Sequence, residues 1–201
     1  MPFTGADRYA TAEKVFDTFF AGRSFDEAFV ATGTNFPDAL TASAAGGALD
    51  VPVLLVRGTS STSLPDSMVG KLKAAGVKTL NLVGGESAVS KPIRDKLKAE
   101  GFELNELGGE NRYETNQAVN DFLKWEGVTG LWVASGRNFP DALSAAVPAS
   151  QPDQRLTLSP GNCLPKPVAD WVKDNTLNHV TLVGGKTVLG QGAFDLTACS
   201  K

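Results

Sequence analysis

The sequence predicts an α/β protein made of two tandem Rossmann-like modules, each a small, mostly parallel sheet flanked by helices. Three observations predict this fold class. Motifs recur in the same order along the chain, segments of helical periodicity alternate with short strand-like segments, and runs such as 28–31 and 53–56 are uninterrupted by polar residues. Uninterrupted apolar strands between helices are typical of a parallel sheet that helices cover on both faces. The 201 residues suffice for two compact domains.

Four motifs occur twice, at separations of 100 to 104 residues. The pairs are Asp7-Arg8-Tyr9 with Asn111-Arg112-Tyr113, residues 33–42 with 136–145, Leu64-Pro65 with Leu164-Pro165, and residues 82–85 with 182–185. The second pair shares Asn-Phe-Pro-Asp-Ala-Leu, and the fourth shares Leu-Val-Gly-Gly. This pattern predicts a tandem duplication, with the first module at residues 1–105 and the second at 106–201.

The first half of the first module predicts two helices and two strands. Residues 13–20 carry apolar side chains at helical spacing, and the run 28–31 predicts a strand. Pro37 and Asp38 are both favourable in a first helical turn, so a helix is expected from there to residue 45. The run 53–56 predicts a second buried strand.

The rest of the module predicts a helix over 64–75, capped by Ser63 and closed by Gly76. A strand over 79–83 follows and ends at Gly84-Gly85. We interpret this pair as a tight turn that allows close packing; the alternative is a turn whose backbone amides approach an anion, next to the hydroxyl of Ser87. A last helix opens at Ser90 and Pro92 and ends at Gly101, and residues 102–107 lead into the second module. The second module is less regular, since residues 151–158 are more polar than their counterparts at 51–56.

Composition excludes several classes of protein. The chain is 42% hydrophobic and 20% charged, which argues against disorder, and its apolar stretches fall far short of the roughly 18 residues that span a bilayer. The net charge of −3 is unlike that of a general nucleic-acid binder. With one histidine, two cysteines and neither glycine-rich nucleotide motif, the sequence predicts no metal site and no cofactor.

The repeated Asn-Phe-Pro-Asp motif supplies candidate ligand-binding residues, Asn35 and Asp38 in one module and Asn138 and Asp141 in the other. Each motif follows a strand and begins a helix, so it lies at the carboxyl edge of a parallel sheet, where ligands usually bind. The carboxylates could accept hydrogen bonds from ligand hydroxyls. The alternative is structural: proline presets the first helical turn, Asp offsets the helix dipole and Asn satisfies the loop backbone.

Arg8 and Arg112 each precede the first helix of a module. A guanidinium there could bind phosphate or carboxylate through a bidentate pair of hydrogen bonds. The alternative is an ion pair with a carboxylate such as Asp38 or Asp141, which would fix the helix to the sheet edge. The tyrosine that follows each arginine is expected to pack rather than to stack on a sugar.

Cys163 and Cys199, both in the second module, suggest a disulfide and hence an oxidising compartment. Residues 1–5 have neither the charged nor the apolar region of a signal peptide. The protein is therefore expected to be either cytosolic or stripped of a secretion signal.

The ordered motifs at residues 5–12, 31–42 and 80–85, and again at 109–116, 134–145 and 181–185, resemble the cell wall binding repeat 2 family. The resemblance covers nearly the whole chain. It implies a secreted, non-catalytic surface-anchoring module of Gram-positive bacteria with a Rossmann-like fold. Such modules hold proteins noncovalently to an anionic secondary wall polymer, teichoic-acid-like or a phosphate-bearing polysaccharide. The resemblance would put six candidates at the shared sheet edge: Arg8, Asn35, Asp38, Arg112, Asn138 and Asp141.

Members of that family commonly carry three repeats around a pseudo-threefold axis, whereas this chain has two. Self-association, or a further repeat in the full-length protein, is therefore expected. Two rival functions remain: a wall-polymer-acting enzyme with Asp38 or Asp141 as acid or base, and a display scaffold without a ligand. No second carboxylate in a repeated motif completes an acid/base pair, which favours binding over catalysis.

Overall fold

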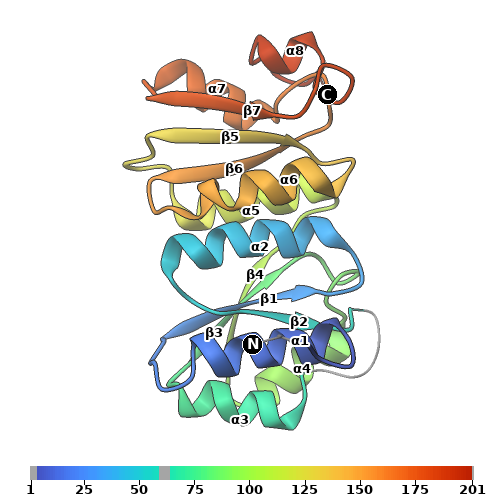
Figure 1. Cartoon of the computed structure of the whole chain (residues 1–201), viewed down its shortest axis with the longest axis vertical. Coiled ribbons are helices and arrows are strands. Elements are labelled where there is room, and N and C mark those ends of the chain that lie inside the picture. The colour runs from blue at the N-terminus through green and yellow to red at the C-terminus, as the bar shows by residue number, and fades with distance from the viewer. Residues whose placement is uncertain (1–3, 59–63, 201) are drawn as a thin grey trace.

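The computed structural model describes residues 4–58 and 64–200, which form two sheets, both entirely parallel (Figure 1). The first sheet has the order β2-β1-β3-β4 and the second the order β6-β5-β7. The strands are β1 (Glu27–Thr32), β2 (Val53–Val56), β3 (Thr79–Val83), β4 (Glu103–Leu107), β5 (Gly130–Ser135), β6 (Gln154–Ser159) and β7 (His179–Val183). This arrangement confirms the predicted α/β fold of two Rossmann-like modules.

Helices alternate with the strands throughout the described residues. They are α1 (Arg8–Phe19), α2 (Phe36–Leu49), α3 (Asp66–Ala74), α4 (Lys91–Ala99), α5 (Arg112–Leu123), α6 (Phe139–Ala146), α7 (Lys166–Asp174) and α8 (Gln191–Phe194), with a short 3₁₀ turn at Pro148–Ser150. Over these residues, no helix is long and apolar enough to cross a membrane.

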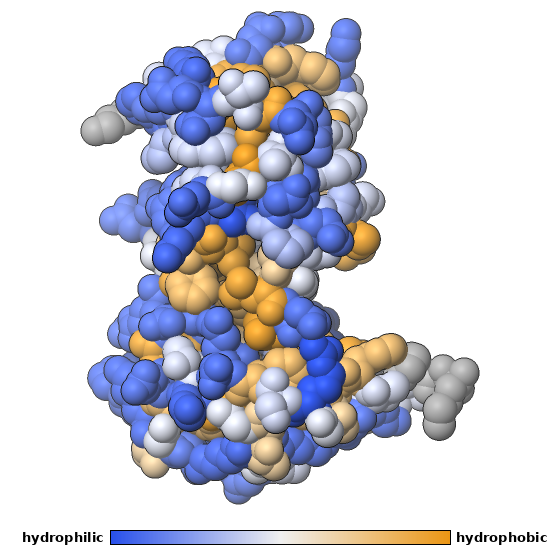
Figure 2. Space-filling view, turned by 90° about the vertical axis from the view of Figure 1, so that its left-hand side faces the viewer, coloured by the Kyte–Doolittle hydropathy of each residue, from blue (hydrophilic) through white to orange (hydrophobic). Residues whose placement is uncertain are grey.

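A central group of helices, α2, α5 and α6, lies between the two sheets (Figure 1). The outer face of the first sheet is covered by α1, α3 and α4, and the outer face of the second by α7. On the inner side, Val119 of α5 packs with Phe29 of the first sheet, while Ala44 of α2 packs with Leu156 of the second. Figure 2 shows hydrophobic residues gathered at the waist between the halves. The two repeats therefore share one layer of helices.

Local capping explains where the first helices begin and end. α1 begins earlier than the periodicity predicts, because Asp7 Oδ1 accepts hydrogen bonds from the amides of Tyr9 (3.0 Å) and Ala10 (2.9 Å). α2 ends later than predicted, at Leu49, and is followed by Asp50 in the left-handed conformation. Its late turns contain Gly46, where a Cβ would lie 2.4 Å from a methyl of Val53, so a side chain would not fit against the sheet.

The later elements agree more closely with the prediction. β2 and β3 occupy the predicted ranges, and Gly76 (φ +83°) and Gly101 (φ +90°) follow α3 and α4. The predicted cap Ser63 lies outside the described residues. β4 spans the expected boundary between residues 105 and 106 and pairs along its whole length with β3 of the first sheet.

The polar segment at 151–158 contains a fully buried strand, β6. Its Arg155 is accommodated because the guanidinium donates to backbone carbonyls of Leu123 (2.9 Å) and Lys124 (2.6 Å), at the end of α5. Asn116 of α5 serves the strand itself: its Nδ2 donates to the Leu156 carbonyl at 2.9 Å and its Oδ1 accepts from the Leu158 amide at 3.0 Å. A buried polar side chain of α5 thus supplies hydrogen-bond partners to backbone groups of β6, the edge strand of this sheet.

Within the described residues, the second sheet has no counterpart of β4. The chain instead turns after the four residues of α8 and returns to Leu164, which bridges to Ala198. Cys163 and Cys199 form the predicted disulfide, with Cα atoms 5.0 Å apart. The disulfide holds the chain's end against the loop before α7.

Candidate functional site

A polar pocket of about 240 Å³ opens at the carboxyl edge of the first sheet. Residues of the first repeat, among them Asn35, Asp38 and Ser87, supply one wall. Residues that open the second repeat, among them Glu110 and Arg112, supply the other. The pocket therefore exists only because the two repeats pack together.

Two helix N-termini line this pocket. Asn35 precedes α2 and its Oδ1 accepts from the Phe36 amide at 2.9 Å. Asn111 precedes α5 and its Oδ1 accepts from the amides of Tyr113 and Glu114, both at 3.0 Å. The N-terminus of a helix carries partial positive charge, so both helices favour the binding of an anion in the pocket that their N-termini line.

Asp38 is the carboxylate at the base of α2. Burial raises its pKa to about 6, and the nearby charge of Arg112 acts in the opposite direction. Its Oδ2 lies against the turn after β3: a Cβ on Gly84, whose φ is +110°, would come within 2.6 Å of that oxygen. Asp141 lies in the same way against Gly184, at 2.9 Å. The Gly-Gly turns thus permit the close packing that the sequence predicted, and the atom packed against them is a carboxylate.

The arginines do not form the alternative ion pairs with Asp38 and Asp141 among the described contacts. Each donates instead to a carbonyl just beyond a strand, Arg8 to Gly33 and Arg112 to Gly136. These carbonyls lie at the helix entry, within reach of the guanidinium. The charge of Arg112 acts on Asp38 of the other repeat, because the packing of α5 on α2 brings the start of the second repeat over the first sheet's edge.

The repeated tyrosines pack, as predicted. A Cβ on Gly33 would lie 2.6 Å from a ring carbon of Tyr9, and one on Gly136 would lie 2.5 Å from a ring carbon of Tyr113. The ring of Tyr9 is also covered by Arg57, whose Cζ is 4.2 Å from the ring centroid. Glycine at these two positions makes room for the rings.

Of the six candidate residues, only Asn35, Asp38 and Arg112 line the pocket together. Asn138 and Asp141 occupy the equivalent place at the start of α6, and the remaining candidate, Arg8, begins α1. The candidates therefore do not form two equal sites within one chain.

Sequence reasoning missed Glu110 and Thr115 of the lining. Glu110 carries no repeat signal, since the equivalent position in the first repeat is Ala6. The charged side chains of the pocket, Asp38, Glu110 and Arg112, sum to one excess negative charge when Asp38 is ionised and to zero when it is protonated. Over the described residues, no group of three or more His, Cys, Asp or Glu side chains could hold a metal ion.

The sequence profile of the family described as cell wall binding domain 2 matches residues 3–94 and 106–193, one segment for each repeat. Among curated proteins, the chain is 25% identical over 182 residues to the N-acetylmuramoyl-L-alanine amidase LytC of Bacillus subtilis strain 168. The aligned segment covers 90% of this chain and 35% of that protein. It is 26% identical over 163 residues to the amidase enhancer of the same organism, covering 81% of this chain and 22% of that protein.

Two solved structures have the same fold. Cwp8 from Clostridium difficile has a TM-score of 0.75 and 27% identity, covering 96% of this chain and 32% of its own. Cwp6 from the same organism has a TM-score of 0.85 and 22% identity, covering 96% and 30%. This chain therefore spans between 22% and 35% of the length of these relatives.

Proposed function

The chain belongs to the cell wall binding domain 2 family, and from this premise we propose that it is a non-catalytic module that attaches noncovalently to an anionic secondary wall polymer. The polymer would be teichoic-acid-like or a phosphate-bearing polysaccharide, and the module a secreted one of a Gram-positive bacterium. Family and relatives point to the cell surface or cell wall as its location.

The observation that carries this proposal is the convergence of two helix N-termini and Arg112 on one polar pocket at the junction of the repeats. Backbone amides at helix starts bind phosphate and carboxylate groups, and a guanidinium adds a geometry that suits the same groups. The chain as a whole is acidic, with a net charge of −3. Attraction of an anion must therefore be local, and it should weaken as salt is added.

Among the residues that the structure describes, the junction of the two repeats forms a complete pocket of this kind. A repeating polymer bound at one site per chain gains avidity only when several chains or repeats are engaged together, since the second contact is then intramolecular. We therefore propose that binding strength depends on assembly. The number of complete pockets, rather than the number of repeated motifs, sets the valency.

Cosedimentation with purified cell walls tests the proposal, before and after the anionic polymer is stripped from the walls. Arg112→Lys keeps the charge and removes the two-pronged geometry, so it should weaken binding several-fold. Arg23→Lys, which changes an exposed arginine paired with Asp50, is the matched control and should bind as the wild type does. Equal binding to stripped and intact walls would refute the anionic polymer as the ligand.

A second candidate function is hydrolysis or transfer on the wall polymer. It is favoured by one observation: Asp38, with its pKa raised to about 6, shares the pocket with a second carboxylate, Glu110. A carboxyl group with such a pKa can act as a general acid near neutral pH. Release of soluble sugar from purified walls by the wild type, lost in Asp38→Asn and in Glu110→Gln, would establish the enzyme. Absence of both turnover and wall binding would favour a display scaffold.

A further inference from the structure

The outer edge strands of the two sheets, β2 and β6, occupy equivalent positions in the two repeats. Val53 of β2 pairs with Phe29, and Leu156 of β6 pairs with Trp132. Phe29 and Trp132 each lie four residues before the glycine that opens a repeated motif. Each outward backbone group of β2 can therefore be compared with its counterpart on β6.

In the second repeat, a carboxamide of α5 bonds this edge. Asn116 Nδ2 donates to the Leu156 carbonyl at 2.9 Å, and Asn116 Oδ1 accepts from the Leu158 amide at 3.0 Å. Asn120 donates to the same Leu156 carbonyl at 3.0 Å. One primary carboxamide thus satisfies a carbonyl and an amide that lie two residues apart on the edge of a parallel sheet.

In the first repeat, the corresponding groups are the Val53 carbonyl and the Leu55 amide. The carbonyls of Pro52 and Val56 accept hydrogen bonds from the amides that flank β1. Because alternate residues of a parallel strand face opposite neighbours, the backbone groups of Val53 and Leu55 face outward. Among the described residues, no side chain or loop backbone bonds the Val53 carbonyl or the Leu55 amide. This edge therefore keeps a free acceptor and a free donor.

The carboxamides are missing here because α1 differs from α5 in sequence. The repeated motifs place Ala12 and Phe16 of α1 where α5 has Asn116 and Asn120. The side chain of alanine ends at its Cβ, and neither alanine nor phenylalanine carries a hydrogen-bonding group.

A pocket of about 200 Å³ lies at this edge, and Ala12 lines it. Leu54 and Leu55 of β2 form another part of the lining, and Leu64 and Met68 a third. One water occupies about 30 Å³ in the liquid, so the pocket has room for a side chain. Helix α1 contacts β2 along this side, which leaves no room for an added strand.

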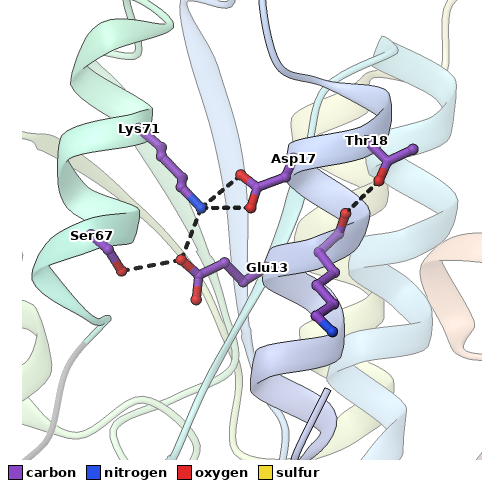
Figure 3. A network of polar contacts seen from close by, with 6 residues as sticks. Glu13, Asp17, Thr18, Ser67 and Lys71 are labelled. Atoms are coloured by element: carbon purple, nitrogen blue, oxygen red, sulfur yellow. Dashed lines mark hydrogen bonds and ion pairs between the residues drawn. The ribbon is translucent and has the colours of Figure 1, made fainter. Parts of the chain in front are cut away.

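The charged side chains that line the pocket are already paired. Glu13 pairs with Lys71 at 2.9 Å and accepts from the Ser67 hydroxyl at 3.1 Å, as Figure 3 shows. Asp7 pairs with Arg57, the pocket's cationic side chain. With these charges neutralised by each other, the pocket favours a neutral polar group on an apolar stem.

We propose that this pocket binds a primary carboxamide of a peptide. The carboxamide oxygen accepts from the Leu55 amide and its nitrogen donates to the Val53 carbonyl, as Asn116 does in the second repeat. The methylene groups that carry the carboxamide contact Leu64 and Met68.

The geometry of the amide selects the class of ligand. A primary carboxamide has a donor and an acceptor on the same side of one planar group, whereas the trans secondary amide of an N-acetylated sugar has them on opposite sides. The ligand is therefore a peptide and not an amino sugar. This pocket shares no lining residue with the pocket at the repeat junction, so the proposal does not rest on the proposed function.

Two-dimensional amide NMR of the isotope-labelled chain tests the proposal. The probe is acetyl-Ala-Gln-Ala-N-methylamide, and its control has glutamate in place of glutamine. The Leu55 amide proton should shift downfield, saturably, with the glutamine peptide. The glutamate peptide should bind about tenfold more weakly, because a carboxylate cannot donate to the Val53 carbonyl.

Two further probes define the ligand. Acetyl-Ala-Ala-Ala-amide has its primary carboxamide at the terminus. Binding of either carboxamide peptide supports the site, and the tighter of the two identifies where in a peptide the group lies. N-acetylglucosamine should leave the Leu55 amide unshifted. A Leu55 amide that responds to neither carboxamide peptide, or that responds equally to N-acetylglucosamine, would overturn the proposal.

Three substitutions on α1 provide the matched variants. Ala12→Asn introduces the carboxamide found in the second repeat, so it should shift the Leu55 amide in the free protein and abolish peptide binding. Ala12→Leu has nearly the same shape without the carboxamide, so it should block the peptide and leave the Leu55 amide unshifted. Thr18→Asn adds a carboxamide outside the pocket, on the side of α1 away from Lys71 (Figure 3), and should bind as the wild type does.

Unchanged resonances from the second sheet show that each variant is folded. In folded Ala12→Asn, peptide binding at wild-type strength would overturn the proposal. A Leu55 amide that responds alike to Ala12→Asn and Ala12→Leu would also overturn it, because the carboxamide would then not reach the edge of β2.

Discussion

Arg112 of the second repeat and Asp38 of the first line the same pocket, and the positive charge of Arg112 acts against the burial that raises the pKa of Asp38 to about 6. The two residues belong to different copies of the duplicated unit. The candidate site therefore lies at the junction of the repeats and is not contained in either repeat alone.

Asp38 should make stability depend on pH. Its folded-state pKa of about 6 lies above the ordinary aspartate pKa of 3.8, so the folded protein holds the proton more tightly than the unfolded chain does. Stability should therefore fall as pH rises from about 4 through 6. Asp38→Asn should remove this loss. At pH 7 its free energy of unfolding should exceed that of the wild type by roughly 1 to 2 kcal/mol. Urea unfolding at pH 4.5 and 7 measures both effects, with the exposed Asp26→Asn as control.

The same titration should govern anion binding. Protonation of Asp38 removes the excess negative charge from the pocket, so wall polymer should bind more tightly at pH 5 than at pH 7. Cosedimentation at the two pH values, at one ionic strength, gives the comparison. Asp38→Asn should bind at pH 7 about as the wild type does at pH 5. A variant that keeps the full pH dependence would assign that dependence to another group.

The disulfide should contribute strongly to the stability of the second module. Cys163 and Cys199 are separated by 36 residues in sequence, and closing a loop of that size stabilises by about 4 kcal/mol in the chain-entropy model. Cys163→Ala/Cys199→Ala should lower the melting temperature, as should reduction of the wild type. Thiol titration of the unreduced, unfolded protein should find no free thiol. Two free thiols per chain would contradict the disulfide.

Gly84→Ala should be costly. At φ +110° an alanine is strained, and its Cβ would meet Asp38 Oδ2 at 2.6 Å and the Ala88 Cβ at 2.7 Å. A loss of about 2 kcal/mol or more is expected on urea unfolding. The control is Gly70→Ala in α3, where a Cβ meets nothing within 4 Å and helix propensity favours alanine by about 1 kcal/mol. Equal effects of the two substitutions would contradict the close packing at Gly84.

Much of the fold can be predicted from the sequence, because its signals are local. The apolar run at 53–56 and the segment 79–83 are strands at those bounds, and the helix-closing glycines Gly76 and Gly101 have positive φ. The duplication predicted two modules, because two segments that share the same motifs in the same order are expected to adopt the same fold. For the candidate site, the sequence identified Asn35, Asp38 and Arg112 by type, because each belongs to a repeated motif at a helix start.

Other features were decided only by tertiary packing. The polar strand β6 is buried with help from α5: Asn116 bonds the backbone at Leu156 and Leu158, and carbonyls at the helix's end accept hydrogen bonds from Arg155. Arg112 lines the same pocket as Asp38 and its charge acts on that carboxyl group, because α5 packs on α2 across the junction. Both outcomes depend on contacts between residues far apart in the chain. Capping and hydrophobic periodicity act within a single turn or strand, so they determine the same elements in each repeat. The pocket at the junction depends instead on the packing of one repeat against the next, which no local signal encodes.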